Sequence, residues 1–151
     1  MARKKKFEIS GIFKNQEFCE AGKIILSEKL NEIISLIEVL FKDDGSENIH
    51  ALRIALRRFR YVFEIFSLCY SKKLFNDVYE KVKYLQDLIG ECRDLDVLAP
   101  KVELIALEVK SKIPKYFYKK IDEERLKSRQ FIKLELIKFI GDKNVNSFLI
   151  K

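Results

Sequence analysis

The hydrophobic positions of this chain recur at intervals of three and four residues over most of its length. Between Glu17 and Phe41 the pattern runs through Ile25, Leu26, Leu30, Ile33, Ile34, Ile37 and Leu40. This spacing places apolar side chains along one face of a helix and leaves the other face polar. The sequence therefore predicts a long amphipathic helix over about residues 17–41.

Breaks in the pattern divide the rest of the chain into further helices. The stretch 43–46 reads DDGS, in which Gly45 ends the first helix and Ser46 begins a second that runs to about Tyr70. Ser71 is a good N-cap for a third helix, which we expect Pro100 to end. A short helical segment is predicted over about 101–110. A last long helix is predicted over about 115–140, after Pro114 and before Gly141.

These elements predict an all-α fold, an antiparallel bundle of four long helices plus a short connecting helix. Short connections between long helices favour antiparallel neighbours, and five Gly and two Pro leave little material for the turns of a β fold. We divide the chain into a basic N-terminal lead-in (1–16), the helical bundle (17–141) and a C-terminal tail (142–151).

Charge narrows the class of partner without selecting one. The net charge is +7 and the isoelectric point is near 9.2. A basic protein of this kind favours polyanions, namely nucleic acid, a polyphosphate chain or an anionic membrane surface. No apolar stretch approaches the roughly 18 residues that span a membrane, and we expect no membrane partner.

The cysteines and the N-terminus predict a cytoplasmic protein. Cys19, Cys69 and Cys92 are odd in number and widely spaced, so we expect buried, reduced thiols. The basic run at the start has no apolar segment behind it, which disfavours secretion.

Residues 50–60 read HALRIALRRFR and hold four of the eight arginines of the chain. At about 100° per residue, one helix face carries His50, Arg53, Arg57, Arg60 and Glu64, with Tyr61 near its edge. Arginines three and four positions apart repel each other by about 0.2–0.5 kcal/mol per pair. Guanidinium groups match phosphate oxygens bidentately. The pattern predicts a face that binds an anion.

Catalysis and metal binding find little support in the sequence. His50 is the single histidine and the cysteines are dispersed, so no metal site is expected. Asp94 and Asp96 could form a metal-binding pair in an enzyme acting on a phosphorylated substrate, but no third ligand lies in sequence reach. We expect Asp94, Asp96 and Tyr61 to hold basic side chains in place. We predict no enzyme activity, no catalytic residue and no cofactor.

Two motifs in order resemble a known family. HxxRxxxRRxR over 50–60 and LxxxxGxxRDLDVL over 85–98 together resemble the CHAD domain, the conserved histidine α-helical domain. The family is described as built from two similar four-helix units that bind inorganic polyphosphate, with no catalysis of their own. The resemblance implies anion-binding roles for His50, Arg53, Arg57, Arg58, Arg60 and Arg93, and for Arg125 and Arg129 on the last helix.

The chain departs from that family in two respects. It is long enough for one unit only, and a homodimer that restores the pair is a hypothesis from length. Gln130 stands where an arginine is expected on the last helix. The resemblance also implies an association with polyphosphate granules.

Two other functions remain open from the sequence. One is a nucleic-acid-binding helical protein, which the charge permits although no helix-turn-helix or zinc-finger signature is present. The other is a helical scaffold in which carboxylates such as those of Asp94, Asp96, Glu28 and Glu32 pair with the arginines internally.

Overall fold

The computed structural model describes residues 11–12 and 16–150 of the chain. Most of the predicted lead-in (1–16) lies outside the described residues. The elements in order are α1 (Phe18–Lys42), α2 (Ser46–Ile65), the 3-10 turn η1 (Ser67–Cys69), α3 (Lys72–Glu108), α4 (Lys115–Ile140) and α5 (Lys143–Asn146). The described residues contain no strand, so the all-α class and its four long helices are confirmed.

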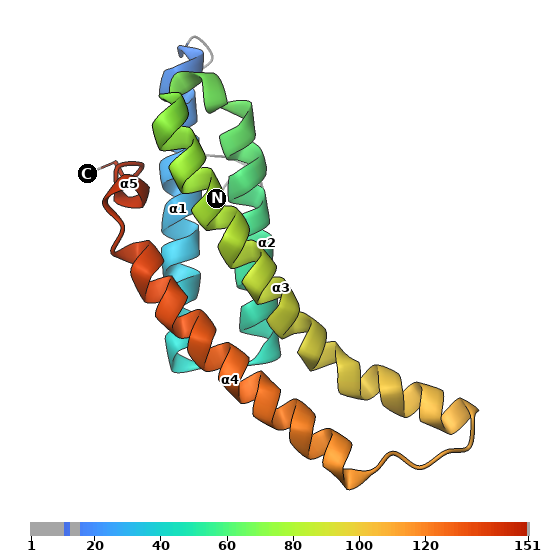
Figure 1. Cartoon of the computed structure of the whole chain (residues 1–151). Coiled ribbons are helices and arrows are strands. Elements are labelled where there is room, and N and C mark those ends of the chain that lie inside the picture. Colours follow the sequence, from blue (N-terminus) through green and yellow to red (C-terminus); the bar gives the residue numbers. More distant parts are fainter. Residues whose placement is uncertain (1–10, 13–15, 151) are drawn as a thin grey trace, which may run out of the picture.

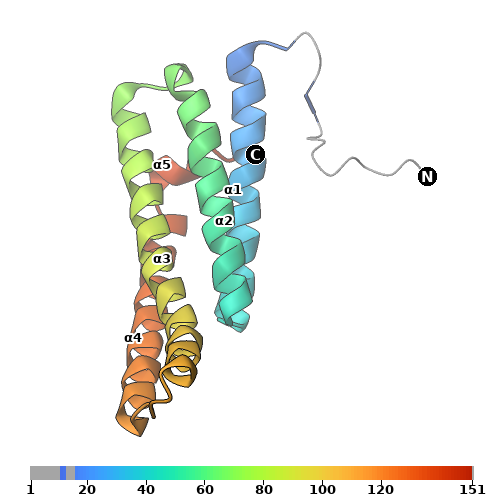
Figure 2. The same ribbon diagram turned by 90° about the vertical axis from the view of Figure 1, so that its right-hand side faces the viewer.

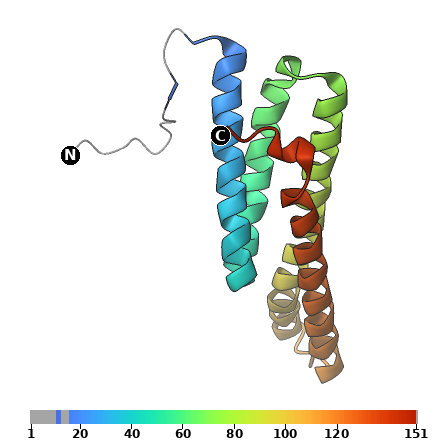
Figure 3. The ribbon, with the colours of Figure 1, turned by 90° about the vertical axis from the view of Figure 1, so that its left-hand side faces the viewer.

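The long helices pack in chain order, α1 on α2, α2 on α3 and α3 on α4. Figure 1 shows that α3 and α4 continue past the loop between α1 and α2 as a two-helix arm. The turned views show α2 and α3 side by side (Figure 2) and α5 against the side of the bundle (Figure 3). None of the helices in the described part of the chain is long and apolar enough to cross a membrane.

The predicted hydrophobic stripes form the core. On α1 the side chains of Leu26, Leu30 and Ile33 are fully buried. They pack with the apolar face of α2 and with the stripe on α3, namely Leu52, Ala55, Leu56, Phe59, Phe63, Val78, Val82, Leu85, Ile89 and Cys92. Burial of each large apolar side chain contributes about 1.5–3 kcal/mol. The core therefore fixes which face of α2 remains polar.

Helix α3 differs from the prediction at its C-terminal half. It runs through Pro100 to Glu108 as one helix, so the prediction that Pro100 ends it was wrong. The predicted connecting helix over 101–110 is the end of α3. Proline lacks an N–H and its ring crowds the preceding turn, but Pro100 is exposed, and the neighbouring turn is held to α4 through Asp96. The arm it forms exposes Leu104 and Leu107 at 62% and 75%.

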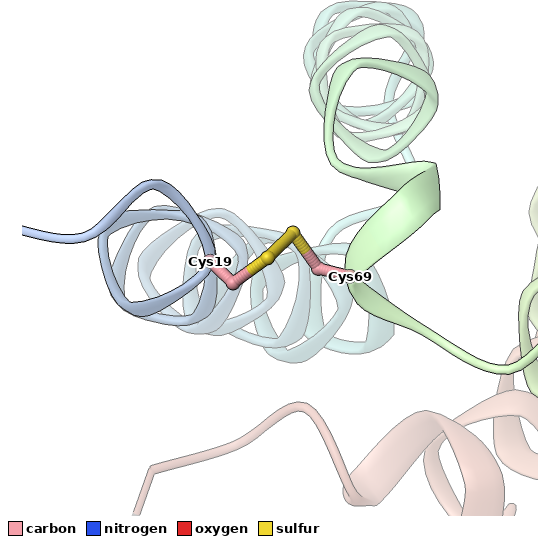
Figure 4. Close-up of a disulfide and its surroundings, with 2 residues drawn as sticks. All are labelled: Cys19 and Cys69. Carbon is pink, nitrogen blue, oxygen red and sulfur yellow. A yellow bond between two sulfur atoms is a disulfide. The ribbon is translucent and has the colours of Figure 1, made fainter.

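Helix α2 also ends earlier than predicted, at Ile65. The 3-10 turn η1 follows it and places Cys69 beside the first turn of α1. Cys19 and Cys69 form a disulfide with their Cα atoms 5.4 Å apart (Figure 4). The prediction of three reduced thiols was therefore wrong, and Cys92 alone is a free, buried thiol. Because disulfides are rare in cytosolic proteins, cysteine usage no longer supports the cytoplasmic location.

Close packing at the same end of the bundle depends on Gly22. A Cβ atom built there would lie 2.5 Å from a ring carbon of Phe66, whose ring also lies 4.7 Å from that of Phe18. We expect Gly22→Ala to lower the free energy of unfolding by about 1–2 kcal/mol, because overpacking outweighs the gain in helix propensity. Urea unfolding measures the difference.

Gly90→Ala is the matched control for this substitution. Gly90 is also helical, but its added Cβ would meet only the Arg53 Nε, at 3.6 Å, an ordinary contact. We expect this variant to be as stable as the original or up to about 1 kcal/mol more stable. Equal effects of the two alanines would contradict the packing argument.

The last residues, which we set apart as a tail, pack on the core through α5. Val145 and Phe148 are buried, and the Ser27 hydroxyl accepts a hydrogen bond from the Ile150 amide at 2.9 Å. Asp142 caps α5 by accepting from the Val145 amide, and it pairs with Lys81 of α3 at 2.7 Å.

This docking should be sensitive to acid. The hydrogen bond from Lys81 holds the pKa of Asp142 below its ordinary value of 3.8, and it lowers the pKa of Asp77 in the same way. A carboxylate whose pKa is lowered by folding stabilises the folded state above its unfolded value and loses that contribution as the pH falls. We expect Phe148 ring signals in NMR spectra to shift below about pH 3.8 before the bundle unfolds. Simultaneous loss of all core signals would contradict this.

Candidate anion-binding site

One face of α2 carries the side chains that the sequence singled out. We call His50, Arg53, Arg57 and Arg60 the arginine row. Its members recur at three and four residues and flank the buried face formed by Leu52, Leu56, Phe59 and Phe63, so that His50, Arg53 and Arg60 are half-buried and Arg57 is exposed. Because the apolar face is committed to the core, the row lies along one side of the helix.

Helix α3 runs beside part of this row. At one end, Arg93 donates a hydrogen bond to the hydroxyl of Ser46. Further along, the Arg53 Nε lies beside Gly90, 3.6 Å from where a Cβ would be. The Arg53 side chain therefore reaches the surface of α3 at Gly90.

Three members of the row have no acidic partner among residues 16–150. The structure contains no ion pair of His50, Arg53 or Arg57 with a carboxylate in this range. His50 Nδ1 and Arg53 Nε are buried and have no hydrogen-bond partner there, while Arg57 is exposed. A buried polar group without a partner costs about 1–3 kcal/mol, and no carboxylate among residues 16–150 offsets that cost at His50 or Arg53.

The fourth member is partly neutralised. Arg60 Nε lies 3.5 Å from the Glu64 carboxylate, and the Arg60 guanidinium lies 5.2 Å from the centre of the Tyr61 ring. Tyr79 of α3 donates a hydrogen bond to the same carboxylate at 2.7 Å. This bond to Glu64 raises the pKa of Tyr79. The row is thus cationic at one end and balanced by an acid at the other.

The arginines of α4 occupy a different place. Arg125 Nε and an Arg129 terminal nitrogen each donate to one oxygen of Asp96, both at 3.0 Å, and the Asp96 side chain is only 1% exposed. Asp44 lies 3.7 Å from Arg129 and 2.6 Å from Lys133, and the hydrogen bond from Lys133 lowers the pKa of Asp44. This cluster joins α3, α4 and the α1–α2 loop.

The remaining predicted residues lie outside both groups. Arg58 is exposed, and its position next to Arg57 turns it about 100° around α2, away from the row. Asp94 is exposed on α3. The positioning role expected of both aspartates is therefore seen for Asp96 only, and toward Arg125 and Arg129.

Sequence reasoning missed three residues beside the row, namely Ser46, Tyr79 and Gln86. Gln86 has a buried side-chain oxygen without a partner in the described structure. A signal was present, because α3 carries Tyr79, Gln86, Gly90 and Arg93 at helical spacing on one face. Without the register of α3 against α2, that face could not be matched to the arginines.

Within the described residues, no group of three or more His, Cys, Asp or Glu side chains is placed to hold a metal ion. The guanidinium groups of the row offer positive charge and hydrogen-bond donors. Guanidinium donors paired with phosphate oxygens form short, charge-assisted hydrogen bonds.

Comparison with known proteins agrees with the two sequence motifs. The family model of the CHAD domain matches residues 15–103. The matched range holds the arginine row and Arg93, whereas Arg125 and Arg129 lie beyond it. No curated protein and no solved structure matches the chain.

Proposed function

Because this chain belongs to the CHAD-domain family, we propose that it binds inorganic polyphosphate through the arginine row, without catalysis. The row would supply guanidinium donors to successive phosphates, and His50 would supply an imidazole donor. Arg93, held at Ser46, is placed at the same end as His50 and adds a further positive charge.

The observation that carries this proposal is the difference between the two sets of arginines. Arg125 and Arg129 are bonded to a buried carboxylate, whereas Arg53 and Arg57 have no ion pair within residues 16–150. The scaffold interpretation therefore suits the arginines of α4 and does not suit the row. An anionic ligand best explains why Arg53 and Arg57 lie close together without an acidic partner among residues 16–150.

The geometry of α2 suits a linear polyanion. Residues rise about 1.5 Å each along a helix, so the members of the arginine row without an acidic partner among residues 16–150, His50, Arg53 and Arg57, span roughly 10 Å. A phosphate chain lying along α2 would meet several guanidinium groups in succession and release condensed counterions from its own charges. By the same physics as for nucleic acids, the binding constant should fall steeply with salt concentration.

A filter-binding or gel-shift titration with long-chain polyphosphate at several salt concentrations tests the proposal. Duplex DNA at equal phosphate concentration is the competitor, because a nucleic-acid-binding protein would prefer it. Displacement of polyphosphate by the duplex would favour the alternative function. Release of phosphate during incubation with Mg²⁺ would contradict binding without catalysis.

Substitution of His50 tests whether the imidazole belongs to the site. His50 has no acidic partner among residues 16–150 and lies one helical turn from Arg53 on the same face of α2. We expect His50→Ala to weaken polyphosphate binding about threefold to tenfold, the effect of one lost hydrogen bond. A titration at one pH and one salt concentration measures the change, and an unchanged affinity would remove His50 from the site.

A further inference from the structure

The two ends of the arginine row differ in charge. At the N-terminal end of α2, the helix dipole places a partial positive charge near Ser46 and His50, and Arg93 adds a full one. At the other end stands the carboxylate of Glu64, 3.5 Å from Arg60. A polyanion lying along the row is therefore attracted at the His50 end and repelled at the Glu64 end.

The position of the Glu64 carboxylate is fixed by a second helix. The Tyr79 hydroxyl of α3 donates to it at 2.7 Å, so the carboxylate is held between α2 and α3. The Glu64 side chain is 44% exposed, which leaves its charge within reach of a ligand. An unpaired surface glutamate could swing away from an incoming phosphate, but this one would have to break the bond to Tyr79.

Arg60 already has two neighbours at the end of the row where this carboxylate lies. Its guanidinium lies beside Glu64 and over the Tyr61 ring. A phosphate at Arg60 would displace the carboxylate from the guanidinium or lie close to a like charge. The donors with no carboxylate beside them among residues 16–150 are those of His50, Arg53 and Arg57, which span roughly 10 Å of the helix.

We propose that Glu64 ends the anion site and thereby limits the length of phosphate chain that the row contacts. This inference rests on the proposed function. A short chain such as tripolyphosphate would use the open part of the row, from His50 to Arg57. A longer chain would gain few further contacts, because Glu64 and its bond to Tyr79 keep the phosphates from Arg60 and beyond.

The test compares Glu64→Gln with the original protein for tripolyphosphate and for long-chain polyphosphate at one salt concentration. The amide keeps an acceptor for Tyr79 and removes the negative charge. We expect affinity for the long chain to rise about tenfold, the effect of one charged hydrogen bond gained at Arg60. Affinity for tripolyphosphate should change less than twofold.

Glu91→Gln is the matched control, because Glu91 is exposed on α3 outside the face that holds Tyr79, Gln86 and Gly90. It changes the net charge equally and should raise both affinities by the same small factor. Equal gains for both ligands with Glu64→Gln, or no gain, would overturn the inference while the original protein still binds. Failure of the original protein to bind either ligand would overturn the proposed function itself.

Discussion

Replacing Arg57 by Ala should weaken polyphosphate binding by tenfold to about a hundredfold. Arg57 lies in the middle of the arginine row, is exposed, and has no ion pair within residues 16–150. Its guanidinium is therefore free to bind phosphate without first leaving another partner. A hydrogen bond between charged groups contributes about 1.5–3 kcal/mol, and each 1.4 kcal/mol is a factor of ten in affinity. Filter binding at one salt concentration measures the change.

Arg58→Ala is the control that separates the row from diffuse charge. The two arginines are adjacent, both are exposed, and either substitution lowers the net charge by one. They differ in direction, because Arg58 points about 100° away around the helix. We expect Arg58→Ala to weaken binding less than threefold. Equal losses of affinity in Arg57→Ala and Arg58→Ala would mean that binding depends on net charge alone. The arginine row would then not be a specific binding site.

Replacing Asp96 by Ala should destabilise the bundle by about 3 kcal/mol. The Asp96 side chain is 1% exposed and accepts hydrogen bonds from Arg125 and Arg129. Removing one partner from a buried ion pair costs about 3–5 kcal/mol, because the remaining charges lose their partner. The lower end applies here, since the arginine side chains are 31% and 19% exposed and can turn partly to water. Urea unfolding measures the loss.

Asp94→Ala is the matched control on the same helix. Asp94 is exposed, so its removal should change stability by no more than about 0.5 kcal/mol. Asp96→Asn should fall between the two, because the amide oxygen keeps the acceptor that both arginines share and the negative charge is lost. Polyphosphate affinity of the folded Asp96→Ala protein should be unchanged, and a large rise would place the released Arg125 and Arg129 in the binding site.

Much of the fold followed from local signals. The predicted ranges 17–41 and 115–140 nearly coincide with α1 and α4, because a Gly-Ser pair and a Pro–Gly pair mark their ends and the stripes between them are regular. The prediction that Pro100 ends a helix was wrong because the local rule gives the free-energy cost of a proline inside a helix. That rule takes no account of contacts with another helix that offset this cost. That compensation comes from α4, which holds the neighbouring turn through Asp96.

Only the part of the candidate site that lies on α2 could be predicted from the sequence. The face of α2 followed from helical spacing, since all its members lie on one helix. The pairing of Arg125 and Arg129 with Asp96 joins residues about 30 positions apart on different helices, and spacing within one helix carries no such information. The sequence did contain a signal for the disulfide. Cys19 and Cys69 lie equally far along the chain from Asp44 in the α1–α2 loop, so two antiparallel helices joined there bring them to the same end of the bundle.

The loop between α3 and α4 lies at the far tip of the arm, away from both the core and α2 (Figure 1). Ser111 is exposed there, and the chain's own cysteines are either joined in the Cys19–Cys69 bridge or buried at Cys92. A cysteine introduced by Ser111→Cys would be the one accessible thiol. The tip therefore offers an attachment point for a dye or a surface tether, from which ligand binding can be followed in real time.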